Sequence, residues 1–134
     1  MRKINFELRE LLRSDTATKL GINNMPQAVS IYQNLFELII YLLQPIRDGV
    51  GIPIVISSGY RCPELNKAVK GAKNSNHLYG LAADIDCGKE ANQRIFNWVA
   101  HNWKTLPVDE FILGKDAGYV HVSLDKMKLN RILY

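Results

Sequence analysis

Three side chains in this sequence could hold a metal ion, and they fall in two places along the chain. His77 lies in a polar segment, and Asp84 follows seven residues later, inside the run 81–86. His121 lies in the middle of the β-branched run 119–123. Two imidazoles and one carboxylate, with a fourth position open to water, form a recognised catalytic zinc arrangement. These residues therefore predict a metal site, if the fold brings them together.

The residues around Asp84 favour such a meeting. Gly80 lets the backbone turn sharply between His77 and Asp84, and the small side chains of Ala82 and Ala83 let other backbone come close. A carboxylate in a buried strand is costly unless a cation or hydrogen bonds compensate it. A divalent ion would meet that need.

Taken one at a time, these residues have simpler explanations. A histidine in a strand is usually a hydrogen-bonded core residue, and an aspartate after a glycine turn is usually a turn or cap residue. The chain has 3 histidines, however, and His77 and His121 both lie in turn or strand settings. We predict that the third, His101, is structural, because it falls in an amphipathic helix.

Four segments carry a resemblance to a known family: Ser57–Arg61, Asn66–Val69, Gly71–Ile85 and Tyr119–Ser123. Together they resemble the zinc D-Ala-D-Ala carboxypeptidase family, the fifteenth of the metallopeptidase families, which comprises carboxypeptidases, dipeptidases and phage-type endolysins. The chain is most similar in character to the compact, phage-type branch of single small domains. The resemblance covers nearly the whole chain, and the Ser-x-His-x6-Asp element in its Gly/Ala setting is highly specific.

The resemblance implies a single zinc ion held by His77, Asp84 and His121. It also implies that Arg61 faces the site, where it binds substrate or polarises the scissile carbonyl. A guanidinium offers a fixed fork of donors to a carboxylate or a developing oxyanion. A structural salt bridge at a strand end is an equally good explanation of Arg61.

Two further residues are expected to shape the pocket. Ser75 and Tyr60 belong to the matching segments, and the resemblance makes both of them candidate substrate-binding residues. The expected partners are stem peptides of bacterial peptidoglycan.

The general base departs from the family pattern. Such a hydrolase needs a carboxylate that takes a proton from water and delivers it to the leaving amine. The family places a glutamate where this chain has Gly114 or, in another spacing, Gly118. Asp116 in the hairpin loop is one substitute, and Glu110 is another, although strict alternation puts Glu110 on the same strand face as Ile112. The third alternative is that the protein keeps the metal and has lost efficient turnover.

Two functions follow as hypotheses. The first is a zinc metallopeptidase, a carboxypeptidase or an endolysin-like endopeptidase, that hydrolyses stem peptides. The second is a zinc-containing module that binds cell wall without cutting it, because the usual glutamate is missing. Nucleic-acid binding would rest only on the net charge of +4, without a recognised motif, and we expect no nucleic-acid partner.

The pattern of the whole chain predicts an α+β fold, with a small antiparallel sheet and helices packed to one side, similar to D-Ala-D-Ala carboxypeptidases and hedgehog signalling domains. Between residues 28 and 46 the apolar side chains recur in steps of three and four, which predicts the main core helix. Run 114–118 suits a hairpin connection. The expected helices cover residues 5–13, 28–46, 63–70 and 90–103, and the expected strands cover residues 53–58, 81–86, 110–113 and 119–123.

Length and composition predict one monomeric domain over residues 1–134. The first residues carry charges where a secretory signal needs an apolar run, and the longest apolar stretch, 35–43, is too short to span a bilayer. We therefore expect synthesis in the cytoplasm, no stable membrane insertion, and action on the cell wall after phage- or host-assisted release. Cys62 and Cys87 are expected to be idle thiols, with a single bridge between them left open.

Overall fold

The computed structural model describes residues 3–134, and a mixed antiparallel sheet organisation lies at its centre. Within those residues the sheet has 4 strands in the order β1-β2-β4-β3, and every neighbouring pair is antiparallel. The strands are β1 (Ile56–Ser58), β2 (Ala82–Ile85), β3 (Val108–Leu113) and β4 (Val120–Leu124). The predicted α+β class is confirmed, and each strand lies within two or three residues of its expected bounds.

The main core helix is longer than predicted and contains an irregular turn. It runs as α3 (Val29–Leu38), the π-helical turn η1 (Ile39–Leu43) and α4 (Gln44–Val50). Pro45 has no N–H and its ring crowds the preceding turn, and the wider turn just before it accommodates that ring. In this turn the N–H of the residue after η1 bonds the carbonyl of Ile39. The chain finally leaves the helix at Gly51, which has a left-handed backbone conformation.

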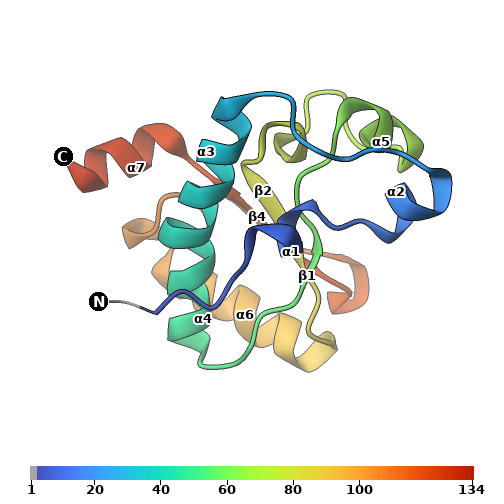
Figure 1. Ribbon diagram of the computed structural model, residues 1–134. Coiled ribbons are helices and arrows are strands. Elements are labelled where there is room, and N and C mark those ends of the chain that lie inside the picture. The colour runs from blue at the N-terminus through green and yellow to red at the C-terminus, as the bar shows by residue number, and fades with distance from the viewer. Residues whose placement is uncertain (1–2) are drawn as a thin grey trace.

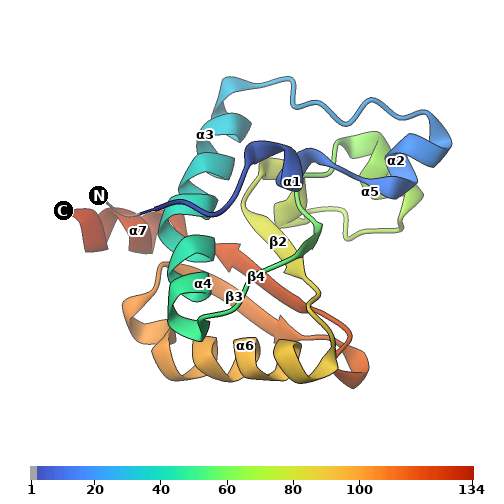
Figure 2. The ribbon, with the colours of Figure 1, turned by 60° about the horizontal axis from the view of Figure 1, so that its bottom comes forward.

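Helix α6 (Lys89–Asn102) covers the other side of the core. It contacts β3, β4 and α4, and Figure 2 shows it running beneath the sheet. The ring of Phe96 on α6 lies 5.7 Å from that of Phe111 on β3. Ile95 and Val99 of this helix are fully buried in the same hydrophobic cluster. One face of the sheet is thereby packed against helices, which leaves the opposite face for polar side chains.

Short elements surround the polar end of the sheet. Figure 1 shows α2 and α5 next to each other, far from the C-terminal helix α7. Ser14 caps α2 by accepting a hydrogen bond from the backbone N–H of Ala17, as its sequence position predicts. The elements are α1 (Leu8–Leu12), α2 (Asp15–Leu20), α5 (Pro63–Ala68), η2 (Asn76–Tyr79), η3 (Trp103–Thr105), η4 (Lys115–Ala117) and α7 (Lys126–Leu133).

Helix α7 was not expected from the sequence. Its start is marked by Asp125, whose side chain accepts a hydrogen bond from the backbone N–H of Lys128. An aspartate at this position is a strong helix-start signal, but the helix has few apolar side chains to make a periodic pattern. Leu129 is its one buried residue among those described.

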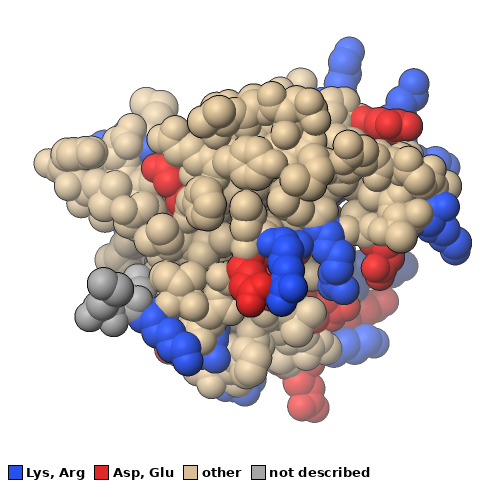
Figure 3. Space-filling model, in the orientation of Figure 1, with Lys and Arg blue, Asp and Glu red and all other residues tan. Residues whose placement is uncertain are grey.

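Two remaining expectations concern cysteines and membranes. Cys62 and Cys87 are both free thiols, which confirms the prediction of idle cysteines. Among the helices formed by residues 3–134, none combines the length and the apolar character needed to cross a bilayer. On the face seen in Figure 3, cationic and acidic side chains are interspersed rather than gathered by sign.

Candidate metal centre

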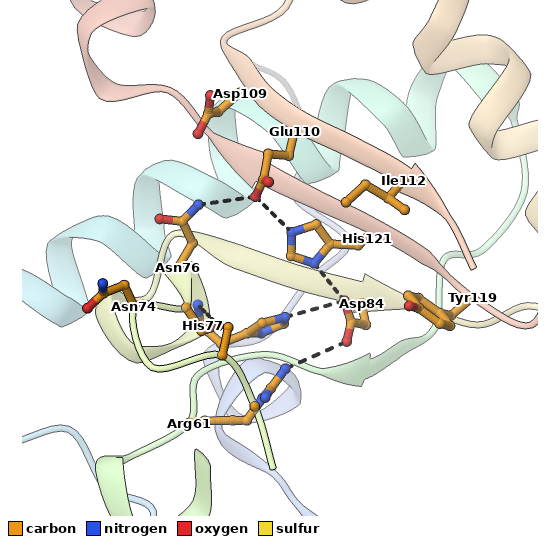
Figure 4. Close-up of a pocket in the computed structure, with 13 residues that line it drawn as sticks. Arg61, Asn74, Asn76, His77, Asp84, Asp109, Glu110, Ile112, Tyr119 and His121 are labelled. Atoms are coloured by element: carbon orange, nitrogen blue, oxygen red, sulfur yellow. Dashed lines mark hydrogen bonds and ion pairs between the residues drawn. The ribbon is translucent and has the colours of Figure 1, made fainter. Parts of the chain in front are cut away.

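Sheet register brings Asp84 and His121 together. Strand β2 pairs with β4 so that Asp84 lies directly opposite His121, while the neighbouring pairs Ala83–Val122 and Ile85–Val120 face the core. Since side chains alternate along a strand, Asp84 and His121 both project from the face that the large helices leave open. Figure 4 shows them side by side there.

His77 reaches the same point from η2. Ser75 begins this turn, and its hydroxyl accepts a hydrogen bond from the backbone N–H of His77 at 3.2 Å. Gly80 ends it with φ 74°, a left-handed conformation that directs the chain into β2. One ligand atom from each of His77, Asp84 and His121 lies within 4.8 Å of the others. The fold therefore brings the three predicted ligands into one cluster that could hold a metal ion.

The hydrogen bonds of His77 show that the cluster suits a cation. Its Nδ1 donates to the carbonyl oxygen of Gly59 at 2.7 Å, so in the neutral ring Nε2 carries the lone pair. That Nε2 lies 3.3 Å from Oδ1 of Asp84. A lone pair and a carboxylate oxygen repel each other unless a proton or a metal ion lies between them. A carbonyl bonded to the far ring nitrogen is also the usual support of a metal-ligating histidine.

His121 has a similar arrangement with a carboxylate as its support. Its Nδ1 lies 2.9 Å from Oδ1 of Asp84, and its Nε2 lies 3.4 Å from Oε1 of Glu110. Burial lowers the pKa of His121, but the hydrogen bond and charge of Asp84, with the charge of Glu110, outweigh it and raise the pKa above its ordinary value. Burial likewise raises the pKa of Asp84, and its bonds to His121 and His77 outweigh this and hold the pKa well below its usual range. The carboxylate is therefore ionised, as a metal ligand must be.

Arg61 lies beside Asp84 and is held on its other side by Asn66. Its Nη1 donates to Oδ1 of Asn66 at 3.0 Å, and its Nη2 lies 4.0 Å from Oδ2 of Asp84. Its Nε is buried without a hydrogen-bond partner among residues 3–134. Burial lowers the pKa of Arg61, and the charge of Asp84 partly opposes this. Arg61 thus combines the two roles expected of it, since it pairs with an acid and also faces the cavity.

Gly71 leaves room for this arginine. A Cβ at position 71 would overlap Oδ1 of Asn66 and Nη1 of Arg61. The amide of Asn66 is itself anchored, because its Nδ2 donates to the carbonyl of Ala72 at 3.0 Å. The guanidinium is therefore oriented by a fixed amide in a space that only glycine leaves open.

The ligand cluster lies at one side of a cavity of about 540 Å³, shown in Figure 4. We call this the metal-side cavity. Its polar lining includes the ligand residues and Arg61, and also Asn74, Ser75, Asn76, Asp109, Glu110 and Tyr119. Ser75, a predicted pocket residue, lies here. Tyr60, the other one, is 3% exposed and does not line this cavity; burial raises its pKa.

A β-bulge places two acids at the cavity. Val108 pairs with Leu124, but three residues later Phe111 pairs with Val122, so β3 contains one extra residue. Asp109 and Glu110 consequently both line the cavity. Strict alternation gave no reason to consider Asp109, because the extra residue has no signal in the sequence pattern.

Glu110 and Asp116, the two proposed bases, lie in different surroundings. Ile112 pairs with His121, so the face that Glu110 shares with Ile112 is the ligand face. Oε1 of Glu110 also accepts a hydrogen bond from the side chain of Asn76 at 3.4 Å. Asp116 lies in η4, is exposed, and does not line the metal-side cavity. The geometry brings Glu110, and not Asp116, to the predicted ligands.

Tyr119 explains why position 114 carries no side chain. The backbone of Gly114 has φ −67°, which any residue can adopt, yet a Cβ there would overlap the ring of Tyr119. The N–H of Gly114 also donates to the carbonyl of Tyr119 at 2.8 Å. The place where the family carries a glutamate is thus filled by an aromatic ring that lines the cavity.

Removing the carboxylate of Glu110 is expected to weaken zinc binding by about 10- to 100-fold, the usual effect of losing the partner of a ligating histidine. Glu110→Gln should lose less than Glu110→Ala, because an amide oxygen can still accept from Nε2 of His121. Competition with a chromophoric chelator measures the affinity. Asp109→Ala, the neighbouring acid without a printed contact to a ligand, serves as control. Equal affinities for all three variants and the unmodified protein would contradict the expectation.

The fold and the site together define a class of protein. An α+β domain with two imidazoles and one carboxylate beside an open cavity is the architecture of a metal-dependent hydrolase. The sequence profile of the family described as peptidase M15 matches residues 4–123, so the chain belongs to that family. The family predicted from the four motif segments is confirmed.

One curated relative gives a more local match. The zinc D-Ala-D-Ala carboxypeptidase of Streptomyces albus G is 43% identical to this chain over 49 residues. The matched segment is 36% of this chain and 19% of the relative. The chain is thus similar to a limited part of that longer protein.

Proposed function

We propose that this protein is a zinc-dependent peptidase that hydrolyses peptide bonds in the stem peptides of bacterial peptidoglycan. The observation that carries the proposal is the meeting of His77, Asp84 and His121 beside a cavity large enough for a peptide segment. Family membership and the similarity to a zinc D-Ala-D-Ala carboxypeptidase support the substrate class. All ligands come from a single chain, which is compatible with a monomer.

The proposed ligands are Nε2 of His77, Oδ1 of Asp84 and Nδ1 of His121, because these atoms face one another while the far nitrogens of both rings are hydrogen-bonded elsewhere. One zinc ion held in this way supplies a Lewis acid and a water with a pKa of about 7. The role of the two supporting groups, Gly59 and Glu110, is to keep the rings oriented.

Arg61 is the proposed substrate-binding residue. Asn66 and Asp84 fix its guanidinium at the edge of the cavity. From there its donors can bind a substrate carboxylate or the oxygen of the carbonyl under attack. Glu110 is the carboxylate best placed to exchange a proton with water and the leaving amine, since its side chain is half exposed and lines the cavity.

Digestion of purified peptidoglycan tests the proposal. Protein loaded with one equivalent of zinc should release new amino groups from the wall, and removal of the metal by a chelator should stop the release. Adding zinc back should restore it. Zinc-loaded, folded protein that releases no amino groups from walls of several peptide compositions would overturn the proposed hydrolysis.

The filled position 114 favours a second candidate function. A module that holds zinc and binds wall fragments without cutting them would need the ligands and Arg61, but no general base. Tyr119 over Gly114 is the specific observation in its favour, because it occupies the place of the family's glutamate. Binding of stem peptides together with zero release of amino groups would support this candidate, and clear turnover would eliminate it.

A further inference from the structure

A second cavity lies on the other side of Arg61. Its volume is about 420 Å³, and we call it the Arg13 cavity. Arg61 and Asp84 line both this cavity and the metal-side cavity, so the two adjoin at that pair of residues. Tyr60, which the sequence suggested as a pocket residue, lines the Arg13 cavity. The site is consequently hollowed on two sides of Arg61.

The Arg13 cavity has the chemistry of a carboxylate-binding site. Arg13 is exposed, and no carboxylate within residues 3–134 forms an ion pair with it. The cavity wall around it is rich in hydroxyl groups, from Ser14, Thr16, Ser57 and Ser58, and its acids are Asp15 and Asp84. An arginine with neighbouring hydroxyl donors favours a carboxylate, which it can bind through two parallel hydrogen bonds.

The metal-side cavity has the opposite character at its far end. Asp109 and Glu110 lie there, on β3, while Arg61 lies at the border with the Arg13 cavity. A groove that passes over Asp84 would therefore run from an acidic end to a basic end. Peptides that bear both amino and carboxylate groups along their length match such a groove, and electrostatic complementarity would fix their direction.

We propose that the two cavities are two arms of one peptide-binding groove, and that the Arg13 cavity takes a carboxylate-bearing segment beyond the bond that is cut. The inference rests on the proposed function, and it specifies a substrate that extends on both sides of the ligand cluster. Such a substrate is cut internally. The protein is therefore an endopeptidase of cross-linked stem peptides rather than an enzyme that trims a free terminus.

Binding of two probes tests the groove independently of turnover. One probe is a dye-labelled, cross-linked dimer of stem peptides, and the other is the uncross-linked stem peptide with the same dye. Arg13→Glu should weaken binding of the dimer to zinc-loaded protein by about tenfold, the effect of losing one charged hydrogen bond. The same variant should change binding of the short peptide less than about twofold.

Two more variants complete the comparison. Thr16→Trp should fill the Arg13 cavity from its rim and weaken dimer binding by steric exclusion, without a change of charge. Lys19→Gln is the matched control, because it removes a cation from the same helix α2 at a residue that does not line the cavity. Equal effects of Arg13→Glu and Lys19→Gln on the dimer would overturn the groove, as would equal effects of Arg13→Glu on both probes.

Turnover separates failure of this inference from failure of the proposed function. Release of amino groups at similar rates from both substrates, with Arg13→Glu indistinguishable from Lys19→Gln, would leave the peptidase standing and remove the groove. Selective, Arg13-dependent binding of the dimer without any release of amino groups would establish the groove and remove the hydrolysis.

Discussion

Alanine at position 121 is expected to abolish both tight zinc binding and wall hydrolysis. His121 supplies one of three proposed ligand atoms, and its loss also leaves the half-buried carboxylate of Asp84 without its 2.9 Å partner. Because a metal contributes several kcal/mol of transition-state stabilisation, hydrolysis should fall at least about a thousandfold. His77→Ala should have the same effect, since its Nε2 faces the same carboxylate oxygen.

His101→Ala provides the matched control. This third histidine is exposed on α6, and its Nδ1 contacts the carbonyl of Asn97 in the same helix at 2.8 Å. Zinc content measured by elemental analysis, together with amino groups released from peptidoglycan, should match the unmodified protein. Full hydrolysis by either ligand variant would exclude the proposed mechanism, because no other cluster of metal-ligating side chains was found among the described residues.

The ligand cluster was predictable because its parts are local. His77 and Asp84 belong to one short motif, and a glycine that must turn the chain separates them. His121 could be added because alternation in a strand is a robust rule, and it correctly placed this ring on the face away from its valine neighbours. What the sequence could not supply was the pairing of β2 with β4, which puts Asp84 opposite His121.

The surroundings of the cluster depend on long-range contacts that leave little trace in a sequence. The bulge in β3 adds Asp109 to the cavity, yet it is visible only in the register with β4. The ring of Tyr119 over Gly114 explains an absent glutamate that motif comparison could only note. Likewise, Arg13 reaches the site region only because α1 and α2 fold back beside β1. Local patterns thus predict ligands better than they predict the walls around them.

Gly59→Ala is expected to lower the stability of the protein by about 3 kcal/mol, the upper end of the usual cost of overpacking. A Cβ at this position would overlap the backbone carbonyl of Leu11 and would lie 2.7 Å from its Cα. Backbone atoms of a buried helix cannot move aside as a flexible side chain can. The N–H of Tyr60 also bonds the same carbonyl of Leu11 at 2.7 Å, which fixes the two segments together. A fall in melting temperature of about 10 °C should result.

The same substitution should also weaken zinc binding, because Gly59 and His77 are directly coupled. The carbonyl of Gly59 accepts from Nδ1 of His77, and the N–H of Arg61 donates to the carbonyl of His77 at 3.0 Å. A shift of the 59–61 segment would therefore turn the imidazole and reduce zinc affinity about tenfold or more. Gly118→Ala is a suitable control, since a Cβ there meets one carbonyl oxygen at 3.1 Å and the backbone has φ −74°. If Gly59→Ala lost stability but bound zinc as tightly as the control, the carbonyl of Gly59 would not be what orients His77.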